Sequence, residues 1–171
     1  ERNWPEILWY ISDELSNGGE KSAKEGVELA KLLRKVPGIR TIASMNGPWE
    51  HIMVPHLTIS MPNIAFPVNE ETIKMIRKAG SEFWLYNCGD ERLTLGLYPW
   101  RVGAKGRFQW HYRGMNADPW DDLDGTGSDI IYTVALTGPE GPVPTLKSQM
   151  VMNAVYDHRY AATLEKAVER A

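Results

Sequence analysis

The sequence of 171 residues contains one cysteine and three phenylalanines, and it has neither a concentrated basic segment nor a long apolar run. The single cysteine, Cys88, excludes an intramolecular disulfide and a metal site built from several cysteines. Lys and Arg number 19 and Asp and Glu 22, a net charge of −3, so neither nucleic acid nor an anionic lipid surface is expected as the main partner. No apolar run approaches the roughly 20 residues that a membrane-spanning helix needs, so no membrane partner is expected.

A glycine-rich phosphate-binding loop is also missing after the first apolar run. A nucleotide-binding fold therefore has little support. We expect chemistry without a cofactor or metal, acting on a sugar or another small molecule.

Short apolar, β-rich runs alternate with helical patterns along the chain. The first run, residues 7–11, lacks strict alternation, which suits a strand buried on both faces. Strands on this basis are predicted at 7–11, 40–45, 57–61, 82–87 and 107–112, and helices at 20–35, 69–79, 91–102 and 144–170. A polar loop is predicted at 113–129, and either an extra strand or an extended segment at 130–136. This alternation indicates parallel β-α units.

About five β-α units fit either an open doubly wound sheet or part of an eight-stranded barrel. An intact barrel typically takes about 250 residues, which is more than this chain has. No internal repeat or linker is visible. The prediction is an α/β fold, a partial (β/α)8 TIM barrel, with residues 1–171 as one structural unit.

Chemistry-bearing side chains follow several predicted strands. In β-α proteins functional groups gather at the carboxyl ends of strands. Carboxylates and amides there bind sugar hydroxyls, and indole rings stack on pyranose faces. Trp9 and Trp84, within strands, are expected in the core. The candidate site residues are Asp13, Glu14, Asn46, Tyr86, Asn87, Trp110 and, farther along, Trp120.

The order of several motifs resembles a known enzyme family. The segments ILWYISDE, FWLYN, GRFQWHY, DPW and PTLKSQMVMNAVYDHRYAATLE resemble the C-terminal half of the barrel of glycoside hydrolase family 123 and its relatives. In that family a strand ends in an Asp-Glu dyad, and a closing helix carries an Asp-x-x-Tyr…Leu-Glu pattern. Here the helix pattern is Asp157, Tyr160, Leu164 and Glu165. The resemblance covers nearly the whole chain and makes its strands the fourth to eighth of a barrel.

The resemblance implies cleavage of terminal N-acetyl-β-hexosaminides, with galactosaminides favoured, by a retaining mechanism in which the substrate's own acetamide is the nucleophile. It implies that Glu14 is the general acid/base and that Asp13 orients the acetamide N–H. Tyr86 would bind the acetamide carbonyl, and Trp110 would form a wall of the sugar pocket. The remaining implied sugar contacts are Trp120 for stacking and Asn46 and Asn87 for hydroxyls.

Other interpretations stay open. Relatives often have proline after the dyad, where this chain has Leu15, so a non-catalytic carbohydrate-binding or scaffold domain is the alternative. A third interpretation is a retaining hydrolase of plain hexosides with its nucleophile on another strand. Half a barrel leaves sheet edges unpaired, so we expect a homo-oligomer or an N-terminal half of the barrel in a longer chain. A secreted or periplasmic location also stays open.

Overall fold

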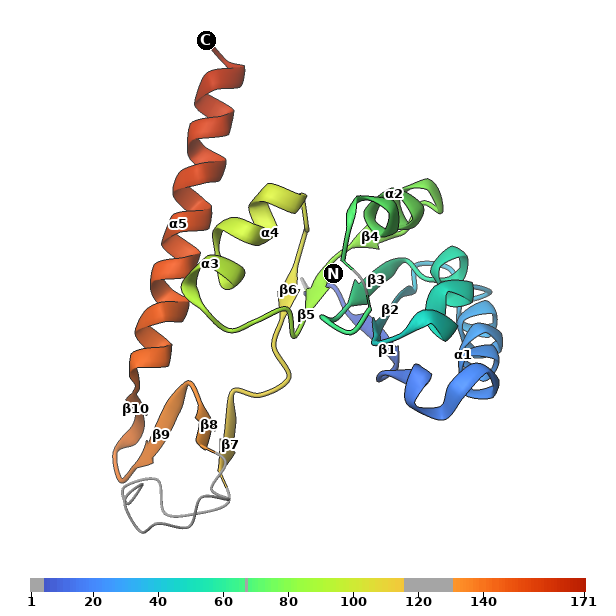
Figure 1. Ribbon diagram of the computed structural model, residues 1–171, viewed down its shortest axis with the longest axis horizontal. Coiled ribbons are helices and arrows are strands. Elements are labelled where there is room, and N and C mark those ends of the chain that lie inside the picture. Colours follow the sequence, from blue (N-terminus) through green and yellow to red (C-terminus); the bar gives the residue numbers. More distant parts are fainter. Residues whose placement is uncertain (1–4, 67, 116–130) are drawn as a thin grey trace. The chain divides into compact units, whose positions relative to one another are not determined.

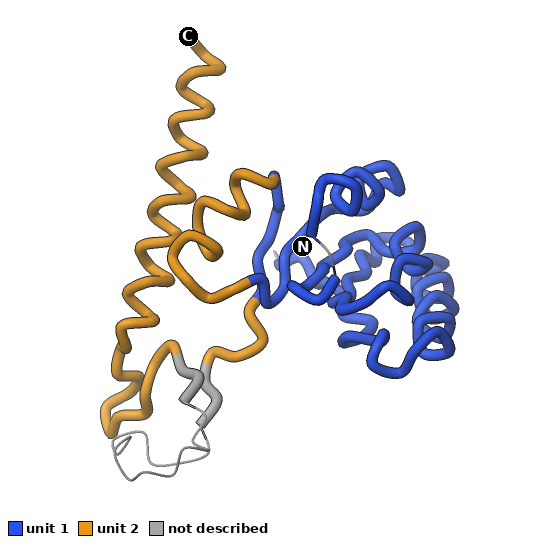
Figure 2. Tube along the Cα trace, in the orientation of Figure 1, with its two compact units in different colours: residues 1–88, 103–108 blue, residues 89–102, 109–171 orange. Residues whose placement is uncertain are grey.

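A computed structural model describes residues 5–66, 68–115 and 131–171, and its chain divides into two compact units (Figure 2). The first unit comprises Glu1–Cys88 and Gly103–Phe108, and the second comprises Gly89–Val102 and Gln109–Ala171. Each unit is described by itself below.

The first unit is built on parallel strands that lie side by side in chain order (Figure 1). The sheet runs β1 (Leu8–Ser12), β2 (Arg40–Met45), β3 (Ile59–Pro62) and β4 (Glu82–Phe83). Beyond Trp84, β5 (Leu85–Tyr86) pairs in parallel with β6 (Arg107–Phe108). The predicted mixed α/β fold with a parallel sheet is confirmed. The strands of the described chain form no closed barrel, so the finer prediction of a partial barrel stays a prediction.

Helical segments connect these strands. The 3-10 helix η1 (Leu15–Gly18) and helix α1 (Gly19–Leu33) follow β1, the 3-10 helix η2 (Pro48–His56) follows β2, and helix α2 (Glu70–Lys78) follows β3. In α1 the residues that recur at helical spacing, Ala23, Val27 and Ala30, are buried, whereas Leu29 and Leu32 are exposed. Helix α2 begins where Asn69 accepts a hydrogen bond from the backbone N–H of Thr72 at 2.9 Å. It ends before Gly80, whose φ of 76° favours glycine.

One core cluster consists of strand side chains alone. Ile42, Ile59, Met61 and Tyr86 form it, and Leu8 and Trp84 pack against it while partly buried. Trp9 is 50% exposed, so its predicted place in the core is wrong. The reason is the position of β1, which ends the strand order and pairs only with β2 among the described strands.

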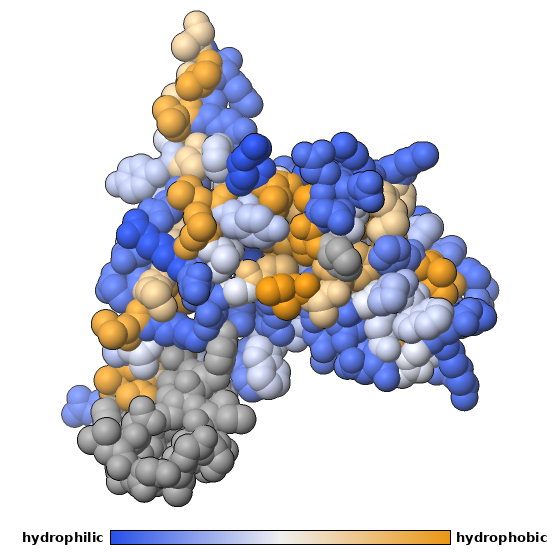
Figure 3. Space-filling model, viewed as in Figure 1, coloured by the Kyte–Doolittle hydropathy of each residue, from blue (hydrophilic) through white to orange (hydrophobic). Residues whose placement is uncertain are grey.

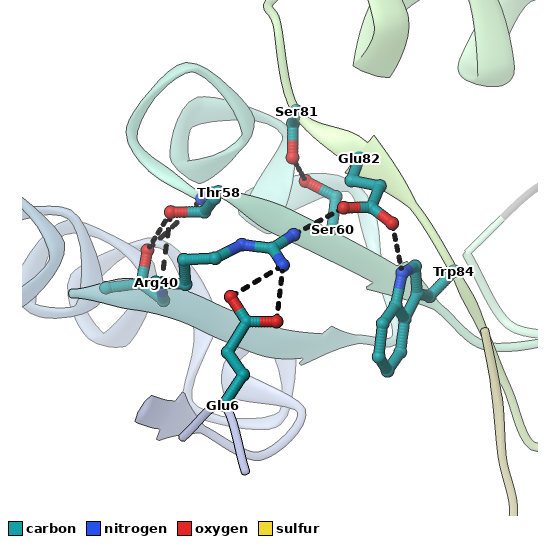
Figure 4. A network of polar contacts seen from close by, with 8 residues as sticks. Glu6, Arg40, Thr58, Ser60, Ser81, Glu82 and Trp84 are labelled. Carbon is teal, nitrogen blue, oxygen red and sulfur yellow. Dashed lines mark hydrogen bonds and ion pairs between the residues drawn. The ribbon is translucent and has the colours of Figure 1, made fainter. Parts of the chain in front are cut away.

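A polar network ties the amino ends of the strands together (Figure 4). Arg40, the first residue of β2, donates to both carboxylate oxygens of Glu6 at 3.0 Å and also pairs with Glu82 of β4. Glu82 in turn accepts from the indole N–H of Trp84 at 3.1 Å. The network therefore links the segment before β1 with β2 and β4, at the end of the sheet opposite to Asp13 and Glu14.

The second unit combines helices with two antiparallel hairpins. Its elements are α3 (Arg92–Leu95), α4 (Leu97–Val102), β7 (Arg113–Met115), β8 (Ile131–Thr133), β9 (Ala135–Gly138), β10 (Gly141–Pro144) and α5 (Leu146–Glu169). β7 pairs with β8 and β9 with β10. The predicted single helix over 91–102 is interrupted at Gly96, and the predicted strand over 107–112 is limited to β6. The predicted long C-terminal helix is confirmed as α5.

Polar contacts attach α5 to α3 and α4. Arg92 donates to both carboxylate oxygens of Asp157 at 2.6 and 2.7 Å, which lowers the pKa of Asp157 below its ordinary value. The Trp100 indole donates to Glu165 at 3.2 Å. Asp157 and Glu165, two members of the helix pattern, thus hold α5 in place within its unit.

Much of α5 is nevertheless exposed. Figure 3 shows apolar side chains on its surface, and Leu164 and Val168 are 66% and 67% exposed. Across the described ranges, no helix combines the length and the apolar character that crossing a membrane requires.

Candidate functional site

The Asp13-Glu14 pair lies at the carboxyl end of β1, where the backbone changes direction. The pairing register with β2 shifts between Tyr10 and Ser12, and Glu14 has a left-handed conformation with φ 50° and ψ 53°. A left-handed conformation costs a residue with a Cβ about 1–2 kcal/mol. Bulges and strained residues gather at functional sites because they re-aim side chains. The backbone therefore turns at Glu14, directly after β1.

Asp13 is held on one of its two oxygens. Asp13 Oδ1 accepts from the Ser44 hydroxyl at 2.7 Å and from the Tyr10 hydroxyl at 2.9 Å, and the two hydroxyls are themselves 2.7 Å apart. Hydroxyl donors stabilise the charged form of a carboxylate. Among the described residues nothing donates to Asp13 Oδ2. That oxygen is left to accept from a ligand.

Glu14 has a different partner. The side-chain N–H of Asn63, which follows β3, donates to Glu14 Oε1 at 2.5 Å. The orientation of this amide is fixed because Asn63 Oδ1 accepts from the backbone N–H groups of Ala65 and Phe66 at 2.7 and 3.3 Å. Glu14 Oε2 has no hydrogen-bond partner in the described part of the chain. Glu14 therefore keeps one oxygen on which a proton can be held or transferred.

Tyr86, at the end of β5, is close enough to Asp13 and Glu14 for their charges to affect its pKa. It is 8% exposed, and burial, followed by the charges of Asp13 and Glu14, raises the pKa of its phenol. A hydrogen bond with Asn87 acts in the opposite direction. Tyr86 consequently stays a neutral hydrogen-bond donor across physiological pH. Asn87 has a φ of 46°, and it and Glu14 are the non-glycine residues with positive φ in the described ranges.

Asn46 belongs to the loop after β2, beside the loop that follows the dyad. Its side-chain N–H donates to Asn17 Oδ1 at 2.7 Å, and its backbone N–H donates to Glu50 Oε2 at 2.7 Å. The structure thus places Asn46 next to the dyad loop, with its amide donor engaged by Asn17.

The structure describes one of the two predicted tryptophans, Trp110. Trp110 belongs to the second unit, where its ring stacks with that of His111 and is 58% exposed. Trp120 lies outside the described residues. A hollow of about 690 Å³ in the second unit is lined by Arg92, Leu93, Leu97, Asp157, Tyr160, Ala161 and Leu164, none of them a predicted site residue.

Tyr10, Ser44 and Asn63 contact the dyad but were not predicted. Asn63 directly follows a strand, the same signal that selected Asn46 and Asn87, so sequence reasoning had the means to find it. Ser44 is a polar residue inside the buried strand β2. Polar residues are uncommon in buried strands, so Ser44 was also recognisable as a candidate from the sequence. Tyr10 has no such signal, because an aromatic residue within a strand is ordinary core composition.

The described residues contain no group of three or more His, Cys, Asp or Glu side chains arranged to hold a metal ion. Comparison of the chain with family models, with curated proteins and with solved structures found no match.

Proposed function

We propose that this chain carries the catalytic dyad of a retaining glycoside hydrolase that removes terminal N-acetyl-β-hexosamine, with N-acetylgalactosamine favoured. The observation that carries the proposal is the pair Asp13 and Glu14 at the carboxyl end of a parallel strand, each acid anchored through one oxygen with the other left for substrate. Strands in chain order and a core cluster of strand side chains alone support a barrel of which these strands are a part.

The first chemical step breaks the glycosidic bond. Asp13 Oδ2 accepts a hydrogen bond from the acetamide N–H, and the Tyr86 hydroxyl orients the acetamide carbonyl. The carbonyl oxygen then forms a bond to the anomeric carbon from the face opposite the leaving group. The bond to the glycosidic oxygen breaks with its electron pair, and that oxygen takes the proton of Glu14. The product is an oxazolinium ion, whose positive charge Asp13 stabilises.

The second step releases the sugar. The Glu14 carboxylate takes a proton from water, whose oxygen forms a bond to the anomeric carbon while the bond to the acetamide oxygen breaks. Two inversions give net retention. Glu14 is restored to its acid form, and the acetamide is restored to the product.

The different anchors of the two acids support this division of labour. Asp13 Oδ1 accepts from two hydroxyl groups, which fix the carboxylate and leave Oδ2 for the acetamide N–H. Glu14 accepts from one neutral amide and has a second oxygen for proton transfer. We assign Asn46 and Asn87 to the sugar hydroxyls, as the resemblance implies. The remaining part of the barrel would come from another segment of a longer chain or from a second copy.

A series of aryl N-acetyl-β-galactosaminides with zero to three fluorine atoms on the acetyl group tests the proposal. Fluorine withdraws electrons from the acetamide oxygen, so each added fluorine should lower kcat if that oxygen is the nucleophile. An equal kcat along the series, or covalent trapping of the protein by a 2-fluoro glycoside, would refute substrate assistance and favour a hydrolase of plain hexosides.

A non-catalytic sugar-binding domain is the second candidate. The chain departs from the family at Leu15, where relatives often have proline after the dyad, and Asn63 already occupies Glu14 Oε1 at 2.5 Å. Titration with N-acetylgalactosamine alongside the aryl N-acetyl-β-galactosaminide assay separates the two candidates, because binding of the sugar without release of the aryl aglycone supports the binding domain.

A further inference from the structure

The loop that carries Glu14 has few apolar anchors. The 3-10 helix η1, which begins directly after Glu14, contains no buried residue. Leu15 packs on α1, since a Cβ added to Gly26 would lie 2.4 Å from Leu15 Cδ1. Polar contacts hold the rest of η1: the backbone N–H of Asn17 donates to the Glu14 carbonyl at 3.1 Å, and Asn17 Oδ1 accepts from Asn46. A further contact runs from the Ser16 hydroxyl to Glu50 Oε2 at 2.8 Å.

Glu50 is fully buried at 0% exposure, and it connects two loops. Its Oε2 accepts from the backbone N–H groups of Asn46 and Gly47 at 2.7 and 3.0 Å, besides the Ser16 hydroxyl. One carboxylate oxygen therefore binds the loop after β1 and the loop after β2 together. The loops approach closely, because a Cβ added to Gly47 would lie 2.7 Å from Ser16 Cβ.

The buried carboxylate of Glu50 is only partly satisfied by the fold. In the described chain no Lys or Arg pairs with Glu50, and its Oε1 is buried without a hydrogen-bond partner. Burial of a carboxylate without a cation is costly, and the three hydrogen bonds that Oε2 accepts offset part of this cost. A contribution to the neighbouring site would account for the presence of an acid here.

We propose that Glu50 is a positioning residue for the dyad: through Ser16 it holds the loop that starts at Glu14, and through its backbone contacts it holds Asn46. It touches neither reacting atoms nor sugar in this role. The expected effect of this positioning on kcat rests on the proposed function. The left-handed backbone of Glu14 is the feature that needs such support, since an unsupported loop relaxes toward ordinary backbone angles.

The test uses Ser16→Ala rather than removal of Glu50, because a Glu50 variant also loses two backbone contacts and risks unfolding. Ser16 Oγ makes its contact to Glu50 alone among the described residues. Ser16→Thr keeps the hydroxyl and serves as the rescue variant, and Glu28→Gln on the exposed surface of α1 is the control. Each protein is assayed for kcat and KM on an aryl N-acetyl-β-galactosaminide and for amide hydrogen exchange over residues 14–18.

Ser16→Ala should lower kcat about tenfold to a hundredfold, because a displacement of about 1 Å costs on that order. KM should change less than about threefold, and exchange over 14–18 should speed up. Ser16→Thr and Glu28→Gln should behave as the unmodified protein. Unchanged kcat and unchanged exchange in Ser16→Ala would overturn the inference. If the unmodified protein releases no aglycone, the proposed function fails, and exchange alone then decides whether Glu50 holds the loop.

Discussion

At the scale of single residues, two neighbouring carboxylates have distinct surroundings. Asp13 is bound by hydroxyl groups from β1 and β2, whereas Glu14 is bound by an amide that follows β3. Adjacent residues reach different partners because the register shift in β1 and the left-handed Glu14 re-aim the backbone between them. The residue types at the strand ends were predictable from sequence. Their hydrogen-bond partners depend on backbone irregularities that no periodicity reveals.

Tyr10 gives the site a measurable response to alkaline pH. Burial, with a further contribution from Asp13, raises the pKa of Tyr10 above its ordinary value of 10.0. The phenol therefore favours folding below pH 10, and this contribution is lost as pH rises through the raised pKa of the folded state. Tyr10→Phe should reduce stability by about 1 kcal/mol at neutral pH through lost hydrogen bonds. It should also make the loss of stability above pH 10 shallower.

Urea unfolding at stepped pH values checks this prediction. Tyr160→Phe, which changes a tyrosine that is 76% exposed, is the control and should leave the slope unchanged. A Tyr10→Phe protein whose stability falls as steeply above pH 10 as that of the unmodified protein would contradict the account.

At the scale of elements, the bounds of segments with a clear apolar periodicity were predictable. The bounds of segments without clear start and stop residues were not. Helix α1 and strand β2 follow their predicted ranges because a stripe of small apolar residues and a β-branched apolar run decide them locally. The segment 91–102 differs because Gly96 interrupts the helix, where a close contact with α5 excludes a side chain. The exposure of Trp9 was not predictable, because it depends on which strands pair and not on the residues of β1.

Gly96 provides the test at this scale. A Cβ at Gly96 would lie 2.6 Å from the backbone oxygen of Ala154 in α5, and a backbone atom cannot rotate away. Gly96→Ala should therefore destabilise the second unit by about 1–3 kcal/mol, the usual cost of overpacking. Lys166→Ala on the exposed surface of α5 is the control and should shift the thermal midpoint little. Equal midpoints for Gly96→Ala and the control would show that α3 and α5 are not in close contact.

At the scale of the whole molecule, the sheet of the first unit has an open edge at β1. β1 pairs with β2 on one side alone among the described strands, and Ile7, Trp9 and Tyr10 are 62%, 50% and 50% exposed. An edge strand with exposed large apolar side chains is prone to pair with another chain. Part of a barrel would have strands in chain order and an open edge of this kind. Both features support the proposal that another segment or a second copy supplies the remaining strands.

The edge predicts self-association of the 171-residue chain. Sedimentation should show an average mass that rises with concentration, and Trp9→Ser should weaken the association about tenfold, the effect of removing an apolar contact worth about 1.4 kcal/mol. Trp49→Ser, which changes a tryptophan of similar exposure (47%) in η2, is the matched control. A monomer at every concentration, or an equal effect of the two substitutions, would contradict this prediction.

The role of the dyad is tested most directly by aglycone release from an aryl N-acetyl-β-galactosaminide. Glu14→Gln should lower kcat by about 10²–10⁴-fold, the usual contribution of general acid–base catalysis. Asp13→Asn should lose most activity too, without rescue by azide, because the nucleophile belongs to the substrate. Glu20→Gln on the surface of α1 should retain full activity. Unchanged turnover in folded Glu14→Gln protein would contradict the assignment of Asp13 and Glu14 as the catalytic pair.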